Sequence, residues 1–339
     1  MDSKSKYVTA GLKCPGCGSI EFELYTTPEQ SLVCAHCAAR YPIDDGVVRM
    51  DNAAPQENST SAFYETCGGS HFVGTTFESN PLIYVTTRAY CRFLDSLTLD
   101  PSKPVLDFGC GDGRLSLWAA ERKFISVVAM DSNLASLKRL AAEARQRGLD
   151  NLLIVCADAA RPPLRNGFFE TVLCFEVLYY LVPSLGRQQA IRIPAELLSP
   201  TGTMVVSEFT RYGRAIIDLD AMNLENARSL VRSSTRWEKF GDSRLETFLW
   251  SLGEIEADFL DAGFTIVSRT GISIAAALFS YAWTFTTYPL RPSLDASTRE
   301  LIEAISDRTE GACDAARNIV YALRYQAVGA DSISPPVDG

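Results

Sequence analysis

The sequence has few histidines and no excess of positive charge. The 339 residues include two histidines, His36 and His71, and 32 lysines and arginines against 41 aspartates and glutamates, which gives a formal net charge of −9. Such a chain lacks a large field that attracts nucleic acid or an anionic membrane, so any basic site must be local. With 47% hydrophobic and 22% charged residues, the composition excludes disordered and collagen-like chains. The length of the chain predicts two domains, or one large domain with an appendage.

The N-terminus also lacks an apolar stretch of the kind found in signal peptides. We therefore expect a cytoplasmic protein whose ten cysteines are metal ligands or buried thiols, not a disulfide framework. Residues 270–290 contain no charged residue and approach the length of a membrane span, but serine, threonine and tyrosine interrupt them. This segment is interpreted as a core helix or a wall of the substrate site, with a homodimer face or a lipid contact as alternatives. No transmembrane span is expected.

Four of the cysteines have the spacing of metal ligands. Cys14 and Cys17 form one C-x2-C pair, and Cys34 and Cys37 form a second pair after sixteen intervening residues. Each pair places two thiolates on one side of an ion and the hairpin between them brings the pairs together, which suits tetrahedral Zn²⁺. Four protein thiolates leave no coordination site for water, so the predicted zinc is structural. His36 could replace a cysteine, although four cysteines already suffice.

The chain continues from the second cysteine pair as YPIDDGVVRM, residues 41–50. Together with the cysteine pairs, residues 12–50 resemble the small zinc-ribbon family of methyltransferase activator proteins. The resemblance implies that residues 1–50 form a zinc ribbon that activates a methyltransferase or is fused in front of one. Because this region is not basic, we expect it to pack on a protein and not on nucleic acid.

Residues 51–62 are polar and are expected to form a linker, and residues 63–98 are expected to form a helical flap. Within the flap, Pro81 begins a predicted helix that continues to about residue 97. A series of hydrophobic segments follows. The first segment runs into a glycine-rich loop, Asp-Phe-Gly-Cys-Gly-Asp-Gly, at residues 107–113. The next segments end at Asp131, Asp158 and Glu176. The loop lacks the Lys-Ser/Thr of a phosphate-binding P-loop, and a carboxylate some twenty residues further on suits a ribose diol. Each acid taken alone could instead be a strand-end or helix-capping residue.

This succession of motifs resembles the class I S-adenosylmethionine-dependent methyltransferase family from about residue 96 to residue 328. The resemblance implies an α/β fold with a Rossmann-like sheet of seven strands, the last antiparallel. Its core would cover residues 99–330 with insertions at 211–246 and 270–316, before a tail at 331–339. A cationic sulfonium prefers carboxylates and backbone carbonyls to an amide-lined anion site, which agrees with this cofactor.

The resemblance also implies which residues hold the cofactor. The glycine loop would wrap its amino-acid end, Asp131 would hold the ribose hydroxyls, and Asp158 would meet the adenine edge. The full predicted set is Asp107, Gly109, Cys110, Gly111, Gly113, Asp131, Ser132, Asp158, Ala159 and Phe175.

The acceptor site is expected beyond the carboxyl ends of the strands, near Tyr180 and Glu208. The catalytic candidates there are Glu176, His71 and Tyr179. Methyl transfer is an in-line displacement that needs a base only for a poorly acidic nucleophile. The alternatives are a helix-capping role for Glu176 and a surface or capping role for His71.

We expect methylation of an oxygen or nitrogen atom of a small molecule, with an anionic or sugar-like acceptor as one option. The Asn/Asp-Pro-Pro-Tyr/Phe motif of many amino-group methyltransferases is absent after the fourth strand, and we do not expect nucleic acid as a partner. RNA methylation and a non-catalytic protein-binding module stay open as alternatives. Arg228, Arg232 and Arg236 recur at four-residue spacing, which predicts one basic helix face, either solvated or part of an anionic acceptor site.

Overall fold

The computed structural model describes residues 11–26, 29–51, 63, 81–220, 223–240, 242–272, 316 and 318–325. His71, the linker at 52–62 and residues 273–290 of the uncharged segment lie outside them, so the predictions made for these residues stay predictions. Within the described part of the chain, no helix is long and apolar enough to cross a membrane.

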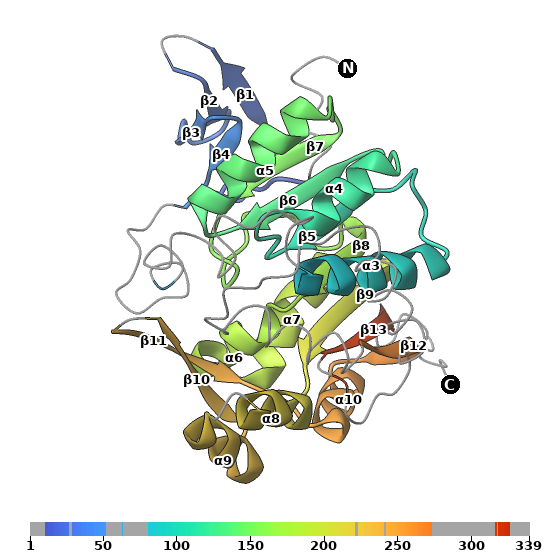
Figure 1. Ribbon diagram of the computed structural model, residues 1–339. Helices are drawn as coiled ribbons and strands as arrows, with labels where there is room; N and C mark the ends of the chain where they lie inside the picture. Colours follow the sequence, from blue (N-terminus) through green and yellow to red (C-terminus); the bar gives the residue numbers. More distant parts are fainter. Residues whose placement is uncertain are drawn as a thin grey trace, which may run out of the picture.

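A central sheet organises the molecule (Figure 1). Seven of its strands lie at the segments that hydrophobic runs predicted, in the spatial order β7-β6-β5-β8-β9-β13-β12. The last of these in the chain, β13, is antiparallel to both β9 and β12, whereas the pairs from β7 to β9 are parallel. This topology confirms the Rossmann-like α/β fold with an antiparallel last strand. The strands are β5 (Val105–Phe108), β6 (Val127–Asp131), β7 (Leu152–Cys156), β8 (Phe169–Phe175), β9 (Leu198–Phe209), β12 (Phe264–Ile272) and β13 (Asn318–Tyr325).

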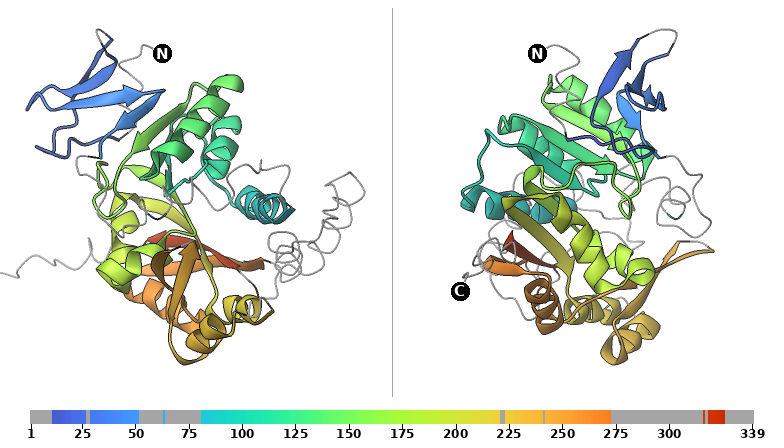
Figure 2. Two further views of the ribbon diagram at one scale, coloured as in Figure 1. Left: turned by 60° about the vertical axis from the view of Figure 1, so that its left-hand side comes forward. Right: turned by 180° about the vertical axis from the view of Figure 1, so that it is seen from behind.

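The predicted number of strands was wrong, because the sheet has eleven. The four additional strands come from the cysteine-bearing region: β1 (Phe22–Tyr25), β2 (Ser31–Cys34), β3 (Arg40–Asp44) and β4 (Val47–Arg49). They form an antiparallel series, and β4 then pairs in parallel with the edge of β7, from Val47 opposite Ile154 to Arg49 opposite Cys156. An edge strand presents unpaired backbone groups, and the ribbon satisfies those of β7. Figure 2 shows the ribbon at this end of the sheet.

Helices cover both faces of the sheet, and the strands alternate between two buried clusters. Val105 belongs to the cluster under α3 (Pro81–Ser96), α4 (Arg114–Glu121) and α5 (Leu134–Gln146). Its neighbour Leu106 belongs to the cluster under α6 (Leu178–Leu185), α7 (Arg187–Leu197) and α10 (Leu252–Asp261). The helix predicted from Pro81 is confirmed as α3. Strands buried on both faces explain the near-continuous apolar runs of the sequence.

A smaller unit follows β9, made of α8 (Arg211–Asp220), α9 (Leu224–Arg232) and a hairpin of β10 (Thr235–Phe240) and β11 (Ser243–Phe248). The predicted basic helix face is wrong here. Helix α9 ends at Arg232, and the next residue, Ser233, is extended. Arg236 therefore lies on β10, where it is buried against Asp218. Four-residue spacing cannot show that a helix has ended between two arginines.

Candidate functional site

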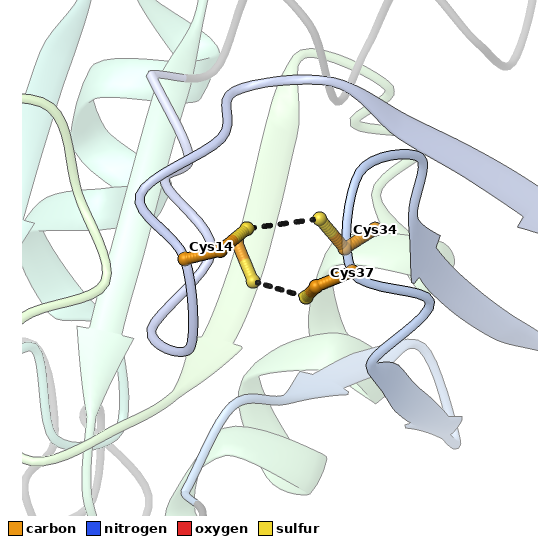
Figure 3. A group of neighbouring side chains, drawn as sticks. Cys14, Cys34 and Cys37 are labelled. Carbon is orange, nitrogen blue, oxygen red and sulfur yellow. Dashed lines mark hydrogen bonds between the residues drawn. The ribbon is translucent and has the colours of Figure 1, made fainter.

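The four predicted metal ligands come together in two facing turns (Figure 3). The Sγ atoms of Cys14 and Cys37 lie 3.6 Å apart, as do those of Cys17 and Cys34, and all four lie within 4.8 Å of one another. Thiolates arranged tetrahedrally at about 2.3 Å from Zn²⁺ are about 3.8 Å apart. The geometry therefore fits a four-cysteine zinc site.

Tyr41 supports this cluster, a role that cysteine spacing does not reveal. Its hydroxyl lies 3.1 Å from Cys14 Sγ, and its ring packs edge-on against Phe22. Burial raises the pKa of Cys14, but hydrogen bonds from Tyr41 and from the backbone of Cys17 and Gly16 outweigh it and lower the pKa to about 6. A thiolate is the form that binds a metal, so these hydrogen bonds favour the ligating form of Cys14.

The ribbon docks on the α/β core of its own chain at both of its ends. Leu12 forms an antiparallel bridge with Leu164, flanked by the hydrogen bonds Lys13 N to Pro163 O (2.9 Å) and Arg165 N to Gly11 O (2.8 Å). At the other end, Met50 N donates to Cys156 O at 2.9 Å. Buried ribbon residues, including the ligands Cys14 and Cys34, belong to one cluster with core residues of β5 to β9. The expectation of packing on protein therefore has a structural counterpart within this chain.

The glycine loop after β5 forms a tight turn whose residues are partly or fully buried. Gly109 has φ +73°, and a Cβ there would lie 2.4 Å from Val177 Cγ2, so no other residue fits without a shift. Gly109 and Cys110 both donate their backbone N–H to Met130 O, at 2.8 and 3.0 Å. Gly111 has φ +54°, but a Cβ there would meet no atom within 4 Å. The loop is therefore pinned to β6 on one side and open at Gly111.

Asp131, at the end of β6, ties this loop in place. One carboxylate oxygen accepts the backbone N–H of Gly111 and the other accepts that of Asn133, both at 2.8 Å. Burial raises the pKa of Asp131, and these N–H donors oppose the shift. The side chain that caps α5 is that of Asn133, which accepts Ser136 N at 2.9 Å.

The structure divides the predicted cofactor residues into one that lies inside the fold and a set at the ends of the strands. Asp107 is buried and accepts Ser116 Oγ at 2.6 Å, and burial raises its pKa to about 6. It therefore supports α4 from inside the fold. Asp158 is exposed beyond the end of β7 and accepts Ala160 N at 2.9 Å. The structure brings one set to the carboxyl ends of β5 to β8, namely Gly109, Cys110, Gly111, Gly113, Asp131, Ser132, Asp158, Ala159 and Phe175. Their role in holding a cofactor stays a prediction.

Glu176 follows β8 in an unusual backbone conformation. Its φ is +61°, in the left-handed region that residues other than glycine rarely adopt. Its Oε1 accepts Tyr90 Oη at 2.8 Å and Asn318 Nδ2 at 3.0 Å, and Ser207 Oγ donates to Tyr90 Oη at 2.9 Å. Tyr90, Asn318 and Ser207 are buried and come from α3, β13 and β9. Such strain recurs at functional sites, where surrounding structure holds it in place.

Glu208, and not Glu176, serves the N-terminus of α6. Its buried carboxylate accepts Leu178 N at 2.9 Å and Tyr179 N at 3.3 Å. Burial raises its pKa to about 8, with the charge of Glu176 acting in the same direction and the backbone donors opposing it. The helix-capping alternative for Glu176 is therefore wrong.

Tyr179 lies in the first turn of α6, near Glu176 at the carboxyl end of β8. Its ring packs edge-on against Phe209 at a centroid distance of 5.2 Å and lies 3.9 Å from that of Tyr180. The third catalytic candidate, His71, lies outside the described residues. Tyr90, Ser207 and Asn318 were not predicted, because no local motif marks three polar residues on separate elements that form one hydrogen-bond network with a carboxylate.

Residues 105–202 match a family model described as a methyltransferase domain. The chain is 27% identical over 133 residues to 27-O-demethylrifamycin SV methyltransferase of Amycolatopsis mediterranei, covering 39% of this chain and 48% of that protein. It is 36% identical over 115 residues to nocamycin O-methyltransferase of Saccharothrix syringae, covering 33% and 39%. A 23S rRNA (uracil(1939)-C(5))-methyltransferase of Alkalilimnicola ehrlichii is 35% identical over 126 residues, covering 33% and 28%. The chain thus spans less than half the length of these curated relatives.

Two solved structures share the fold over most of the chain. The [4+2]-cyclase SpnF superposes with a TM-score of 0.51 at 17% identity, covering 81% of this chain and 98% of that one. A chain from the complex between the Haloferax volcanii Trm112 methyltransferase activator and its partner superposes with a TM-score of 0.50 at 14% identity, covering 80% and 99%. At these identities the likeness concerns the fold alone.

Proposed function

We propose that this chain, whose residues 105–202 form a methyltransferase domain, transfers a methyl group from S-adenosylmethionine to an oxygen or nitrogen atom of a small-molecule acceptor. The observation that carries the acceptor side of this proposal is Glu176, a carboxylate held in a strained backbone conformation at the end of β8. Ligands of open α/β sheets bind beyond the carboxyl ends of the strands, which is where this carboxylate lies.

The glycine loop and the acids after β6 and β7 would hold S-adenosylmethionine, which supplies an electrophilic methyl group on a sulfonium ion. The open space at Gly111 lets a ligand approach the backbone closely. Asp131 keeps the loop in shape through the Gly111 N–H, and its oxygens retain lone pairs for the ribose hydroxyls. Asp158 is exposed on the neighbouring strand end, where the adenine side is expected.

Glu176 would orient the acceptor and take its proton. Both donors that reach this carboxylate, Tyr90 and Asn318, bond to Oε1. No residue in the described ranges donates to Oε2, so this oxygen can accept a proton or a hydrogen bond from the acceptor. A carboxylate fixed at one oxygen and available at the other can act as a positioned base.

The cysteine cluster would bind one structural Zn²⁺ through Cys14, Cys17, Cys34 and Cys37. The separation of the sulfur atoms fits that ion, and complete coordination by protein leaves no position for substrate. The ribbon would thus stabilise the edge of the sheet and take no direct part in chemistry.

Cofactor binding and turnover test the proposal in turn. Calorimetric titration with S-adenosylhomocysteine should give one site per chain, and a labelled methyl donor should then mark members of a panel of hydroxyl and amino compounds. Glu176→Gln should lower kcat by at least about 100-fold while leaving S-adenosylhomocysteine affinity unchanged. The matched control is Glu170→Gln at the other end of β8, where the carboxylate accepts Ser199 Oγ, and it should keep full activity.

Each rival function predicts a different result. Absence of S-adenosylhomocysteine binding would favour a non-catalytic protein-binding module and refute the proposal. Salt-dependent binding and methylation of RNA, in place of small molecules, would favour the RNA alternative. Full activity of the Glu176→Gln variant would remove Glu176 from the mechanism. Fold alone cannot decide among these outcomes, since function is specified by the site.

A further inference from the structure

Helix α8 carries two arginines, Arg211 and Arg214, directly after the end of β9. Their side chains are only 16% and 18% exposed. Both Nε atoms are buried without a hydrogen-bond partner. Arg211 Nη1 donates to Ser234 Oγ at 2.9 Å, whereas the guanidinium of Arg214 has no hydrogen bond to any described residue. A buried guanidinium with five donors is costly to leave unsatisfied.

The carboxylates near these two arginines are already engaged elsewhere. Glu254 lies 3.5 Å from Arg211, but its Oε2 accepts both Ser251 N and Ser251 Oγ in the capping box of α10. Glu238 lies 3.6 Å from Arg214 but makes a much shorter ion pair with Arg236. Arg236 differs from Arg214, because its Nε and Nη2 atoms also donate to the carboxylate of Asp218 at 2.7 and 2.9 Å. Arg236 therefore makes close ion pairs with two carboxylates, whereas the contact of Arg214 with Glu238 is longer, at 3.6 Å.

Arg214 also lies on the acceptor side of the proposed site. Its guanidinium carbon is 5.3 Å from the centroid of the Phe209 ring, and that ring packs against Tyr179 at 5.2 Å. Phe209 ends β9 two residues after Ser207, which hydrogen-bonds to the Tyr90 partner of Glu176. Figure 1 shows α8 close to α10, below the sheet. Two aromatic rings in edge-on contact, Phe209 and Tyr179, thus connect the Arg214 guanidinium to the edge where Glu176 lies.

We propose that Arg214, assisted by Arg211, binds an oxyanion group of the acceptor, either a carboxylate or a phosphate. The inference rests on the proposed function, because it names the substrate class of the same site. A planar guanidinium fork matches both oxyanions in a two-bonded arrangement. The anionic acceptor site thus lies at Arg211 and Arg214, and not at the predicted helix face of Arg228, Arg232 and Arg236. The reacting hydroxyl or amine of the acceptor would then lie toward Glu176.

The test uses the full chain loaded with S-adenosylhomocysteine and two simple probes. Inorganic phosphate and acetate are titrated separately by calorimetry at constant ionic strength. At least one of them should bind at one site per chain. Arg214→Gln should weaken that binding at least about 10-fold, since a charge-assisted bidentate contact is lost. Arg214→Lys keeps the charge but loses the fork, so its affinity should lie between the two.

Arg228→Gln is the matched control, because Arg228 is exposed on the neighbouring helix α9. It should bind the probe as the unchanged protein does. Equal binding by Arg214→Gln and the unchanged protein, or no binding of either probe, would overturn the inference. If S-adenosylhomocysteine binds while both probes fail, the inference falls and the proposed function stands. If S-adenosylhomocysteine itself fails to bind, the proposed function falls, and the same titration of the unloaded chain judges the oxyanion site independently.

A panel of acceptors separates the two oxyanions. Hydroxy acids are compared with their amides, and phosphorylated alcohols with the free alcohols, as substrates for a labelled methyl donor. Methylation confined to acids identifies a carboxylate, and methylation confined to phosphorylated compounds identifies a phosphate. Methylation of neutral and anionic members with equal kcat/KM would contradict the inference.

Discussion

Replacing Asp131 by alanine should weaken both the fold and the cofactor site. In the folded chain its two carboxylate oxygens accept the N–H groups of Gly111 and Asn133 at 2.8 Å. Charge-assisted hydrogen bonds contribute about 1.5–3 kcal/mol each, and water replaces part of this at a partly exposed residue. We therefore expect the free energy of unfolding to fall by about 2–4 kcal/mol.

Cofactor affinity should fall with it, by at least about 10-fold, because the variant loses the predicted ribose contact and the tether that shapes the loop. Asp158→Ala is the informative control. Asp158 is exposed and accepts a single backbone N–H, from Ala160. Its removal should lower cofactor affinity while changing unfolding by less than about 1 kcal/mol.

The assays are denaturant unfolding of the unloaded chain and calorimetric titration with S-adenosylhomocysteine. Asp131→Asn provides a further comparison, because it keeps the size of the side chain and one acceptor oxygen. It should be less destabilised than Asp131→Ala. Unchanged affinity in Asp131→Ala would remove this residue from the cofactor site. Unchanged stability together with lost affinity would show that the loop does not depend on the two backbone contacts.

Two further predictions concern the metal cluster and a buried acid. The purified chain should contain about one equivalent of zinc, and metal analysis that gives less than about half an equivalent in folded protein would contradict this. The Cys34→Ser variant should lose the zinc, and its free energy of unfolding should be lower by more than about 3 kcal/mol. The control variant, Cys91→Ser on α3, should keep the metal. The free energy of unfolding should fall as pH rises from the ordinary pKa of Glu208, 4.5, to its folded value of about 8, because only the folded state holds the proton in that range. Glu208→Gln should flatten this slope in denaturant titrations at several pH values, and an identical slope would contradict the assignment.

Periodicity and loop composition predicted the core of the fold because these features depend on local sequence. A parallel strand of the core that is buried on both faces appears as an unbroken apolar run, such as Leu152–Cys156. The loop at Gly109–Gly113 was evident because positive φ values and close approach require glycine there. The cysteine cluster was evident for a similar reason, since a metal imposes its own spacing on the chain.

The unpredicted contacts of Glu176, Glu208 and Arg236 join residues far apart in the sequence. Tyr90 and Asn318 are separated by 86 and 142 positions from Glu176, yet both donate to its Oε1. Glu208 serves a helix that begins thirty residues before it, at Leu178. Arg236 on β10 donates to Asp218 on α8, eighteen residues before it. Such pairs are specified by topology, which single-sequence periodicity does not contain.

The position of the ribbon shows a connection to the glycine loop that the sequence did not predict. Val47 and Val48 face opposite sides of the sheet, and each joins a different buried cluster of the core. Strand β4 can therefore not leave β7 without exposing apolar surface on both faces. Its hydrogen bonding continues through Met50 N to Cys156 O, and on the other side Cys156 lies opposite Asp131 in register. Cys34 on β2 and the carboxylate that holds the glycine loop thus belong to one continuous run of backbone pairing, although they lie almost a hundred residues apart in the chain.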